Sequence, residues 1–180
     1  MRFPFRALPA AGGGTLTPRP VVDIALEGLT HAPMECLLDT GALRTRISAE
    51  LAPLAGIELG GALTEEFYVG GLKTVGVLAR VNLTVSEGAD EFSWDAPVWF
   101  CDPWPHPFGL AGLEGFLHYF LVTIRAHDGC LDIEPHPWLE NRNDPSVRVA
   151  GQTPQTADPS DGADPAPVKP ASPSPDSYVP

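Results

Sequence analysis

The sequence has no long hydrophobic run and few features of an exported protein. No stretch approaches the roughly 18 consecutive apolar residues of a membrane-spanning helix, so we expect no membrane partner. Residues 1–11 are interrupted by Pro4, Arg6 and Pro9 and therefore lack the continuous apolar segment of a signal peptide.

Cysteines are also scarce. Cys36, Cys101 and Cys130 are odd in number and widely spaced, which excludes a disulfide framework and a zinc signature. Buried free thiols are typical of a reducing compartment, so we expect a cytoplasmic protein. The spacing that brings metal ligands together is likewise missing from four histidines, which are His106, His118, His127 and His136. We therefore expect no metal and no cofactor.

Basic residues are few, with 11 Lys and Arg against 23 Asp and Glu and a net charge of −12. Phosphate binding requires a basic face, so this balance argues against nucleic acid as the main partner. The Gly-rich segments lack the Lys of a phosphate-binding loop, and there is no Ser or Cys nucleophile motif. The charge suits a soluble acidic protein or one that works below neutral pH.

The two ends of the chain differ in composition from the middle. Residues 141–180 contain nine prolines and one aromatic residue, Tyr178. Such a segment buries too little apolar surface to offset its ordering entropy, so we predict a disordered Pro-rich tail. Residues 1–19, with a run of three glycines at 12–14, are predicted to be a flexible N-terminal arm. The remaining residues, 20–140, are enough for one compact domain.

Short apolar runs bounded by turn residues predict that this domain is all-β. The predicted strands are 21–26, 34–38, 44–47, 64–69, 72–85, 92–100, 121–125 and 130–134. Gly70-Gly71 separates two of them and is a hairpin signal. Ser48 is a candidate N-cap for a short helix over 49–55, and the apolar spacing at 116–120 predicts one or two helical turns over 115–120. The sequence contains no internal repeat.

The tetrapeptide Asp39-Thr40-Gly41-Ala42 carries the clearest chemical signal. It follows the apolar run 36–38, so a short strand delivers a carboxylate to the mouth of a loop, and Gly41 permits close backbone approach. An aspartic peptidase uses two such carboxylates, which share one proton and activate a water molecule. The chain has only one such loop, so a second Asp would have to come from a second copy of the chain in a homodimer.

Four segments in order make the sequence resemble the retropepsins, the retroviral-type aspartic proteases, in a bacterial-style version. Residues 37–42 resemble the catalytic loop, and Thr45 falls where the family often has a second Thr. Residues 69–72 resemble the Gly-rich tip of the flap. Residues 105–112 resemble the substrate-wall loop that runs into an apolar-apolar-Gly strand, and residues 115–120 resemble the helix that follows.

The resemblance implies a closed barrel of short strands with one short helix near the C-terminal end, as a single-domain half of an aspartic protease. It implies a homodimeric endopeptidase, a hydrolase acting on peptide or protein substrates. It assigns catalysis to Asp39, Thr40 and Gly41, and substrate binding to Ala42, Val69, Gly70, Gly71, Phe108 and Leu110.

Two departures keep an alternative open. Leu113 stands where retroviral members place an Arg that ties the active-site loop to the dimer, and Ala111 is smaller than the usual Ile or Leu. The alternative is a catalytically inactive retropepsin-like domain that dimerises or binds peptides, because a fold alone does not establish activity. A third hypothesis is an unrelated small β-barrel in which Asp-Thr-Gly occurs by chance.

Overall fold

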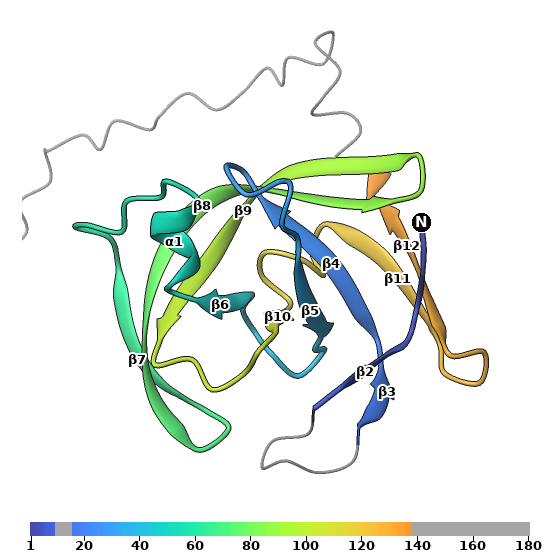
Figure 1. Cartoon of the computed structure of the whole chain (residues 1–180), viewed down its shortest axis with the longest axis horizontal. Helices are drawn as coiled ribbons and strands as arrows, with labels where there is room; N and C mark the ends of the chain where they lie inside the picture. The colour runs from blue at the N-terminus through green and yellow to red at the C-terminus, as the bar shows by residue number, and fades with distance from the viewer. Residues whose placement is uncertain (10–15, 138–180) are drawn as a thin grey trace, which may run out of the picture. The chain divides into compact units, whose positions relative to one another are not determined.

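The computed structural model describes residues 1–9 and 16–137 (Figure 1). They belong to the first of two units into which the chain divides, Met1–Val147. The second unit, Arg148–Pro180, lies outside the described residues, and so does the tail predicted over 141–180. The boundary at residue 140 therefore stays a prediction.

Six strands close into a barrel, which confirms the predicted all-β class. Around the barrel the order is β4, β5, β10, β6, β9 and β8, and β8 pairs with β4 to close the ring. β7 extends the sheet beyond β8, so that the β7–β8 hairpin projects from the barrel (Figure 1). The strands are β4 (Val21–Leu26), β5 (Met34–Leu38), β6 (Arg46–Ser48), β7 (Thr64–Val69), β8 (Leu72–Glu87), β9 (Asp90–Asp102) and β10 (Gly109–Ala111).

The strand bounds follow from apolar content and turn chemistry. β4 is buried along almost its whole length, as its run of aliphatic residues predicts. Gly70 and Gly71 have φ angles of 57° and 84° between β7 and β8. Two consecutive residues with positive φ are typical of the tight turns that match the twist of a hairpin.

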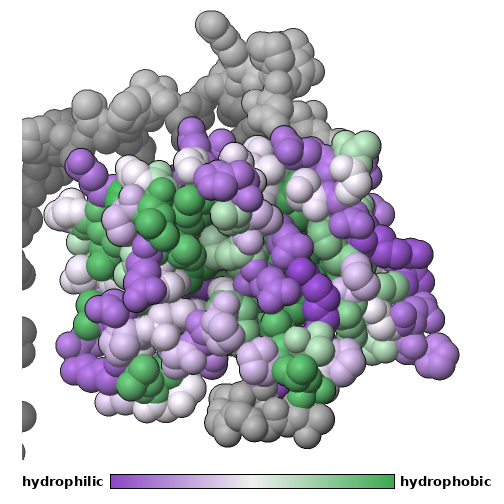
Figure 2. Space-filling view, viewed as in Figure 1, coloured by the Kyte–Doolittle hydropathy of each residue, from purple (hydrophilic) through white to green (hydrophobic). Residues whose placement is uncertain are grey.

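The barrel core is lined by aliphatic side chains from β4, β8 and β9 and by an aromatic cluster. Trp94 lies at the centre of that cluster, where its ring packs edge-on against Phe116 and Phe120. Figure 2 shows apolar side chains gathered on the surface over helix α1 (Leu51–Leu54), and hydrophilic ones over β4 and β5. Among the largest fully buried side chains are Ile24, Leu26, Ile47, Leu83, Phe100, Phe116, Leu131 and Ile133.

The prediction of a flexible arm over residues 1–19 was wrong for the residues described there. β1 (Arg2–Pro4) pairs with β12 (Cys130–Pro135), which in turn pairs with β11 (Phe120–Arg125). β2 (Arg6–Leu8) pairs with β3 (Thr17–Arg19). The physical reason is that Phe3 and Leu8 are both buried, so the segment gains apolar contacts that its glycines and prolines did not reveal.

The helix predicted over 115–120 was also wrong in detail. The amides of Leu117 and His118 donate to carbonyls five residues earlier, at Gly112 and Leu113, which is a wide turn and not an α-helix. The indole N–H of Trp94 donates a hydrogen bond to the Gly115 carbonyl at 2.9 Å. The four residues of α1 lie within the helical segment predicted over 49–55.

Asp132 holds the N-terminal strand to the rest of this sheet. Its carboxylate lies 2.6 Å from the Nε of Arg2 and 2.6 Å from the Nε of Arg125. Hydrogen bonds from Arg2 and Arg125 lower the pKa of Asp132 below its ordinary value of 3.8. A carboxyl group with a lowered pKa stabilises the folded state above its ordinary pKa, and this contribution is lost as the pH falls through the lowered value.

We therefore predict that Asp132→Asn lowers the melting temperature slightly at neutral pH. The difference from wild type should stay constant down to about pH 5 and then shrink as the wild-type carboxylate becomes protonated. Thermal unfolding measured across this pH range tests the prediction. Glu58→Gln, at an exposed carboxylate outside this sheet, is the control. A difference that grows on acidification would contradict the assignment.

Candidate active site

Asp39 lies directly after β5, where the end of the strand is fixed by its neighbour. β5 runs parallel to β10, with Leu38 opposite Ala111. The Asp39 amide donates to the Ala111 carbonyl at 3.1 Å, and the Ala42 amide donates to the Asp39 carbonyl at 3.1 Å. The Gly41 amide donates to Oδ1 of the Asp39 carboxylate at 2.9 Å. The carboxylate is therefore half-buried and oriented by its own loop.

Thr45 joins this loop to the segment that follows β10. Its side chain is 2 % exposed, and its hydroxyl oxygen accepts the Gly112 amide at 3.2 Å. The Leu113 amide donates to the Ala42 carbonyl at 2.9 Å. The two segments approach so closely that a Cβ on Gly112 would lie 2.4 Å from the Arg44 carbonyl oxygen. Gly112 is thus a position where only a hydrogen fits.

The structure brings seven of the nine predicted site residues around one cleft of about 350 Å³. Thr40 and Gly71 are exposed and do not line it. The loop after β5, the tip of the β7–β8 hairpin and the strands β2 and β3 lie at the same end of the barrel (Figure 1). The seven residues are Asp39, Gly41, Ala42, Val69, Gly70, Phe108 and Leu110.

The walls of the cleft are anchored in the protein interior. Phe108 and Leu110 belong to a small buried cluster with Leu8 and Val21, beneath the cleft. These two wall residues are thus also core residues. At the rim, a Cβ on Gly70 would lie 3.7 Å from His106, so the hairpin tip closely approaches the wall loop.

Six further residues line the cleft, and none of them was singled out as a site residue from the sequence, although Leu37 and His106 lie within the segments 37–42 and 105–112 of the family resemblance. The signals available were strand alternation and proximity: Arg46 lies on β6 beside the buried Ile47, and Tyr68 precedes the predicted flap tip. Pro9 and Arg19 could not be assigned from the sequence because they belong to the segment predicted to be a flexible arm. The six are Pro9, Arg19, Leu37, Arg46, Tyr68 and His106.

His106 forms part of the aromatic wall. Its ring stacks on Phe108 with centroids 4.9 Å apart and an angle of 11° between the planes, and Trp104 meets it edge-on. Burial, and then the positive charge of Arg19, lower the pKa of His106 below its ordinary value of 6.5. The imidazole is therefore mostly uncharged at neutral pH, as a stacked ring in a partly apolar wall requires.

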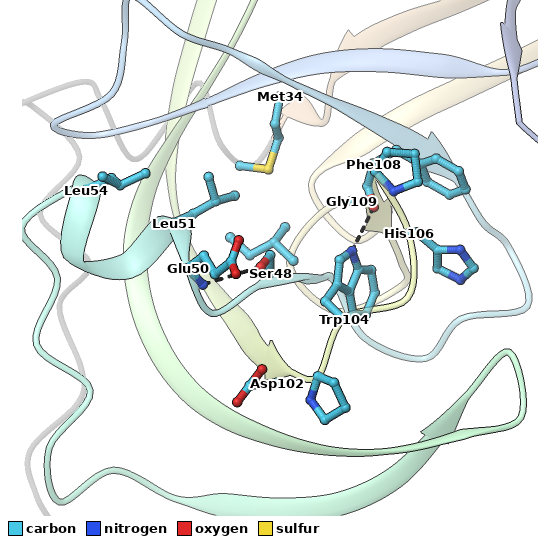
Figure 3. A pocket seen from close by; sticks show the side chains of 13 residues that line it. Met34, Ser48, Glu50, Leu51, Leu54, Asp102, Trp104, His106, Phe108 and Gly109 are labelled. Carbon is cyan, nitrogen blue, oxygen red and sulfur yellow. Dashed lines mark hydrogen bonds between the residues drawn. The ribbon is translucent and has the colours of Figure 1, made fainter.

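A larger hollow of about 470 Å³ lies beside the cleft and shares His106 and Phe108 with it. Figure 3 shows Met34, Leu51 and Leu54 on one side of this hollow, and Trp104, His106 and Phe108 on the other. The Trp104 indole donates to the Phe108 carbonyl at 3.0 Å and holds the wall loop in place. We place the candidate site in the smaller cleft because that cleft contains the Asp39 carboxylate.

Within residues 1–9 and 16–137, no group of three or more His, Cys, Asp or Glu residues could hold a metal ion. Cys36, Cys101 and Cys130 are free, and burial raises the pKa of the Cys36 and Cys101 thiols to about 12. The described part of the chain contains no helix with the length and apolar character needed to cross a membrane.

No family model and no curated protein matches the sequence. Among solved structures, the fold is similar to a retropepsin-like aspartic protease from Rickettsia conorii, with a TM-score of 0.44 and 14% identity. The similarity covers 74% of this chain and 91% of that chain. At this level of similarity, the role of each residue can be inferred only from the geometry of the cleft itself.

Removal of the Thr45 hydroxyl should loosen the loop that carries Asp39. Thr45→Val keeps the shape of the side chain but leaves the buried Gly112 amide without an acceptor, which costs about 1–3 kcal/mol. Chemical denaturation should show a loss of stability of that order. Thr45→Ser, which keeps the hydroxyl and loses a methyl group, should retain the hydrogen bond. Equal stability of Thr45→Val and wild type would contradict this role.

Proposed function

We propose that the protein is an aspartic endopeptidase that hydrolyses peptide bonds as a homodimer. The observation that carries the proposal is the Asp39 carboxylate, which is oriented by the Gly41 amide and lines a cleft beneath the tip of a long hairpin. Asp39 is the only carboxylate among the described residues that lines the cleft. One chain therefore supplies half of the acid–base pair that this chemistry requires.

The surface beside the Asp39 loop supports a symmetric dimer. Leu43 and Leu113 are 54% and 38% exposed, and the backbone joins them, because the Leu113 amide donates to Ala42 and the Glu114 amide donates to Leu43. Exposed leucines next to a candidate site favour contact with another apolar surface. In the proposed dimer, Thr40 and Asp39 of each chain lie at the two-fold axis. Apolar contact through Leu113 then replaces the Arg that other members use.

The proposed reaction depends on two close carboxylates that cannot both ionise at low cost. The ionised Asp39 accepts a proton from a water molecule, whose oxygen attacks the scissile carbonyl carbon. The protonated Asp39 of the second chain donates a hydrogen bond to the carbonyl oxygen and stabilises the charge that develops there. The first Asp39 then gives the proton that it took from water to the amine nitrogen, so that the C–N bond breaks and an amine and a carboxylic acid are released. The β7–β8 hairpins act as flaps that exclude water from the bound peptide.

A peptide-binding domain without catalysis is the second candidate. It is favoured by Leu113, because an apolar contact could support dimerisation without placing the two carboxylates within hydrogen-bonding distance. This candidate requires peptides to bind in the cleft and remain intact. The two candidates are distinguished by product formation, and both require an accessible cleft.

The role of Asp39 in cleavage can be tested by substitution. Asp39→Asn should lower the rate of cleavage by at least about a hundredfold, because an amide cannot act as the general base. Mass-spectrometric profiling of a peptide library at acidic and neutral pH measures the rate. The wild-type rate should follow a bell-shaped pH dependence that reports the pair. Asp102→Asn, at an exposed aspartate outside the cleft, is the control. Unchanged cleavage by Asp39→Asn would exclude the mechanism.

Assembly into a homodimer can be tested at Leu113. Leu113→Glu should shift the protein toward monomer and reduce cleavage in parallel, since a charge at an apolar contact is costly to desolvate. Analytical ultracentrifugation over a concentration series measures the assembly. Leu54→Glu, at an exposed leucine on α1, is the matched control. Full activity of a strictly monomeric protein would refute the proposed dimer.

A further inference from the structure

The cleft has an unusual charge for so acidic a protein. The arginines in the described residues that lie outside the cleft all form ion pairs: Arg2, Arg6, Arg44, Arg80 and Arg125. The two that line the cleft, Arg19 and Arg46, form no ion pair with any carboxylate of the described residues. Carboxylates outnumber cations by far in this chain, so this distribution leaves positive charge where Asp39 lies.

Nearby carboxylates are bound by other arginines. Arg6, the cross-strand neighbour of Arg19, binds both Asp23 and Glu35. Arg44, two residues before Arg46, is paired with Glu65 and also lies near Glu114. The neighbouring arginines thus have acidic partners, whereas the two cleft arginines are left without one.

Arg46 is also held in position. It lies on β6 between β9 and β10, and its guanidinium carbon is 4.2 Å from the centroid of the Phe67 ring. Its Nε is buried and has no hydrogen-bond acceptor among the described residues, a feature that it shares with the Nε of Arg44. That nitrogen is out of a ligand's reach, but Arg46 as a whole is half-buried and lines the cleft. Its terminal nitrogens can therefore meet a carboxylate, whose geometry matches the planar fork of a guanidinium.

We propose that the cleft selects peptides that carry an acidic side chain, and that Arg46 binds its carboxylate. Arg19, on β3, adds a second positive charge to the lining of the cleft. This inference rests on the proposed function for its ligand class, a peptide in the cleft, but not on cleavage. Arg46 is a specificity-determining residue, separate from the chemistry at Asp39.

Binding tests the inference independently of cleavage. Fluorescence anisotropy with full-length Asp39→Asn uses two labelled peptide pools that differ only in Glu against Gln, all with amidated C-termini. The Glu pool should bind about tenfold more tightly, the effect of one charge-assisted hydrogen bond. Arg46→Gln should remove the preference, and Arg46→Lys should retain part of it. Arg80→Gln, outside the cleft, should leave it unchanged.

A further variant, Arg46→Glu, distinguishes loss of the carboxylate-binding site from misfolding. In the Asp39→Asn background it should reverse the preference toward a Lys-containing pool, which misfolding cannot produce. Equal binding of the Glu and Gln pools by the protein with Arg46 intact would overturn the inference. A preference for peptides with a free C-terminus over amidated ones, without any effect of Glu, would also overturn it. Intact peptides after long incubation with wild type would instead overturn the proposed function and leave a Glu preference standing.

Discussion

The hydrogen bond from the Gly112 amide to the buried Thr45 hydroxyl links the two segments on which the cleft depends. One segment follows β5 and carries Asp39, and the other follows β10 and carries the exposed Leu113. They lie side by side because β5 and β10 are parallel neighbours, so both strands end at the same edge of the barrel. The close approach at Gly112 leaves little room for movement. The orientation of the carboxylate is therefore a property of the barrel as a whole.

The cleft combines buried walls with a projecting hairpin tip. Phe108 and Leu110 on its walls belong to a buried cluster with Leu8 and Val21, whereas its rim is the tip of the hairpin at Gly70. Side chains that are fixed by packing hold a geometry better than side chains on free loops. In the proposed enzyme, the hairpin beyond the barrel edge is the element that opens for a peptide to enter.

In the proposed site, positively charged residues bind the substrate, and a different residue, Asp39, carries out the chemistry. The described arginines outside the cleft pair with carboxylates, and the cleft keeps Arg19 and Arg46 beside the single Asp39. A cation without a partner in a partly desolvated cleft attracts an anion more strongly than one at the surface, because the lower dielectric weakens the interaction less. If both proposals hold, the preference for acidic peptides and hydrolysis at Asp39 depend on different residues and can be altered independently.

The sequence by itself determined the all-β class, the approximate bounds of eight strands and seven of the residues that line the cleft. It did so because strands reveal themselves by local apolar runs and turns, and because Asp39, Gly70 and Phe108 lie in short recognisable segments. Only the tertiary structure decided the burial of Phe3 and Leu8, the wide turn in place of a helix at 115–120, and the presence of Arg19 and Arg46 in the cleft. These depend on partners distant in sequence: β12 for β1, the Trp94 indole for the Gly115 carbonyl, and the Phe67 ring for Arg46. The local sequence pattern carries no information about such partners. Long-range packing decides which side of a strand faces the cleft and which arginines form ion pairs with carboxylates.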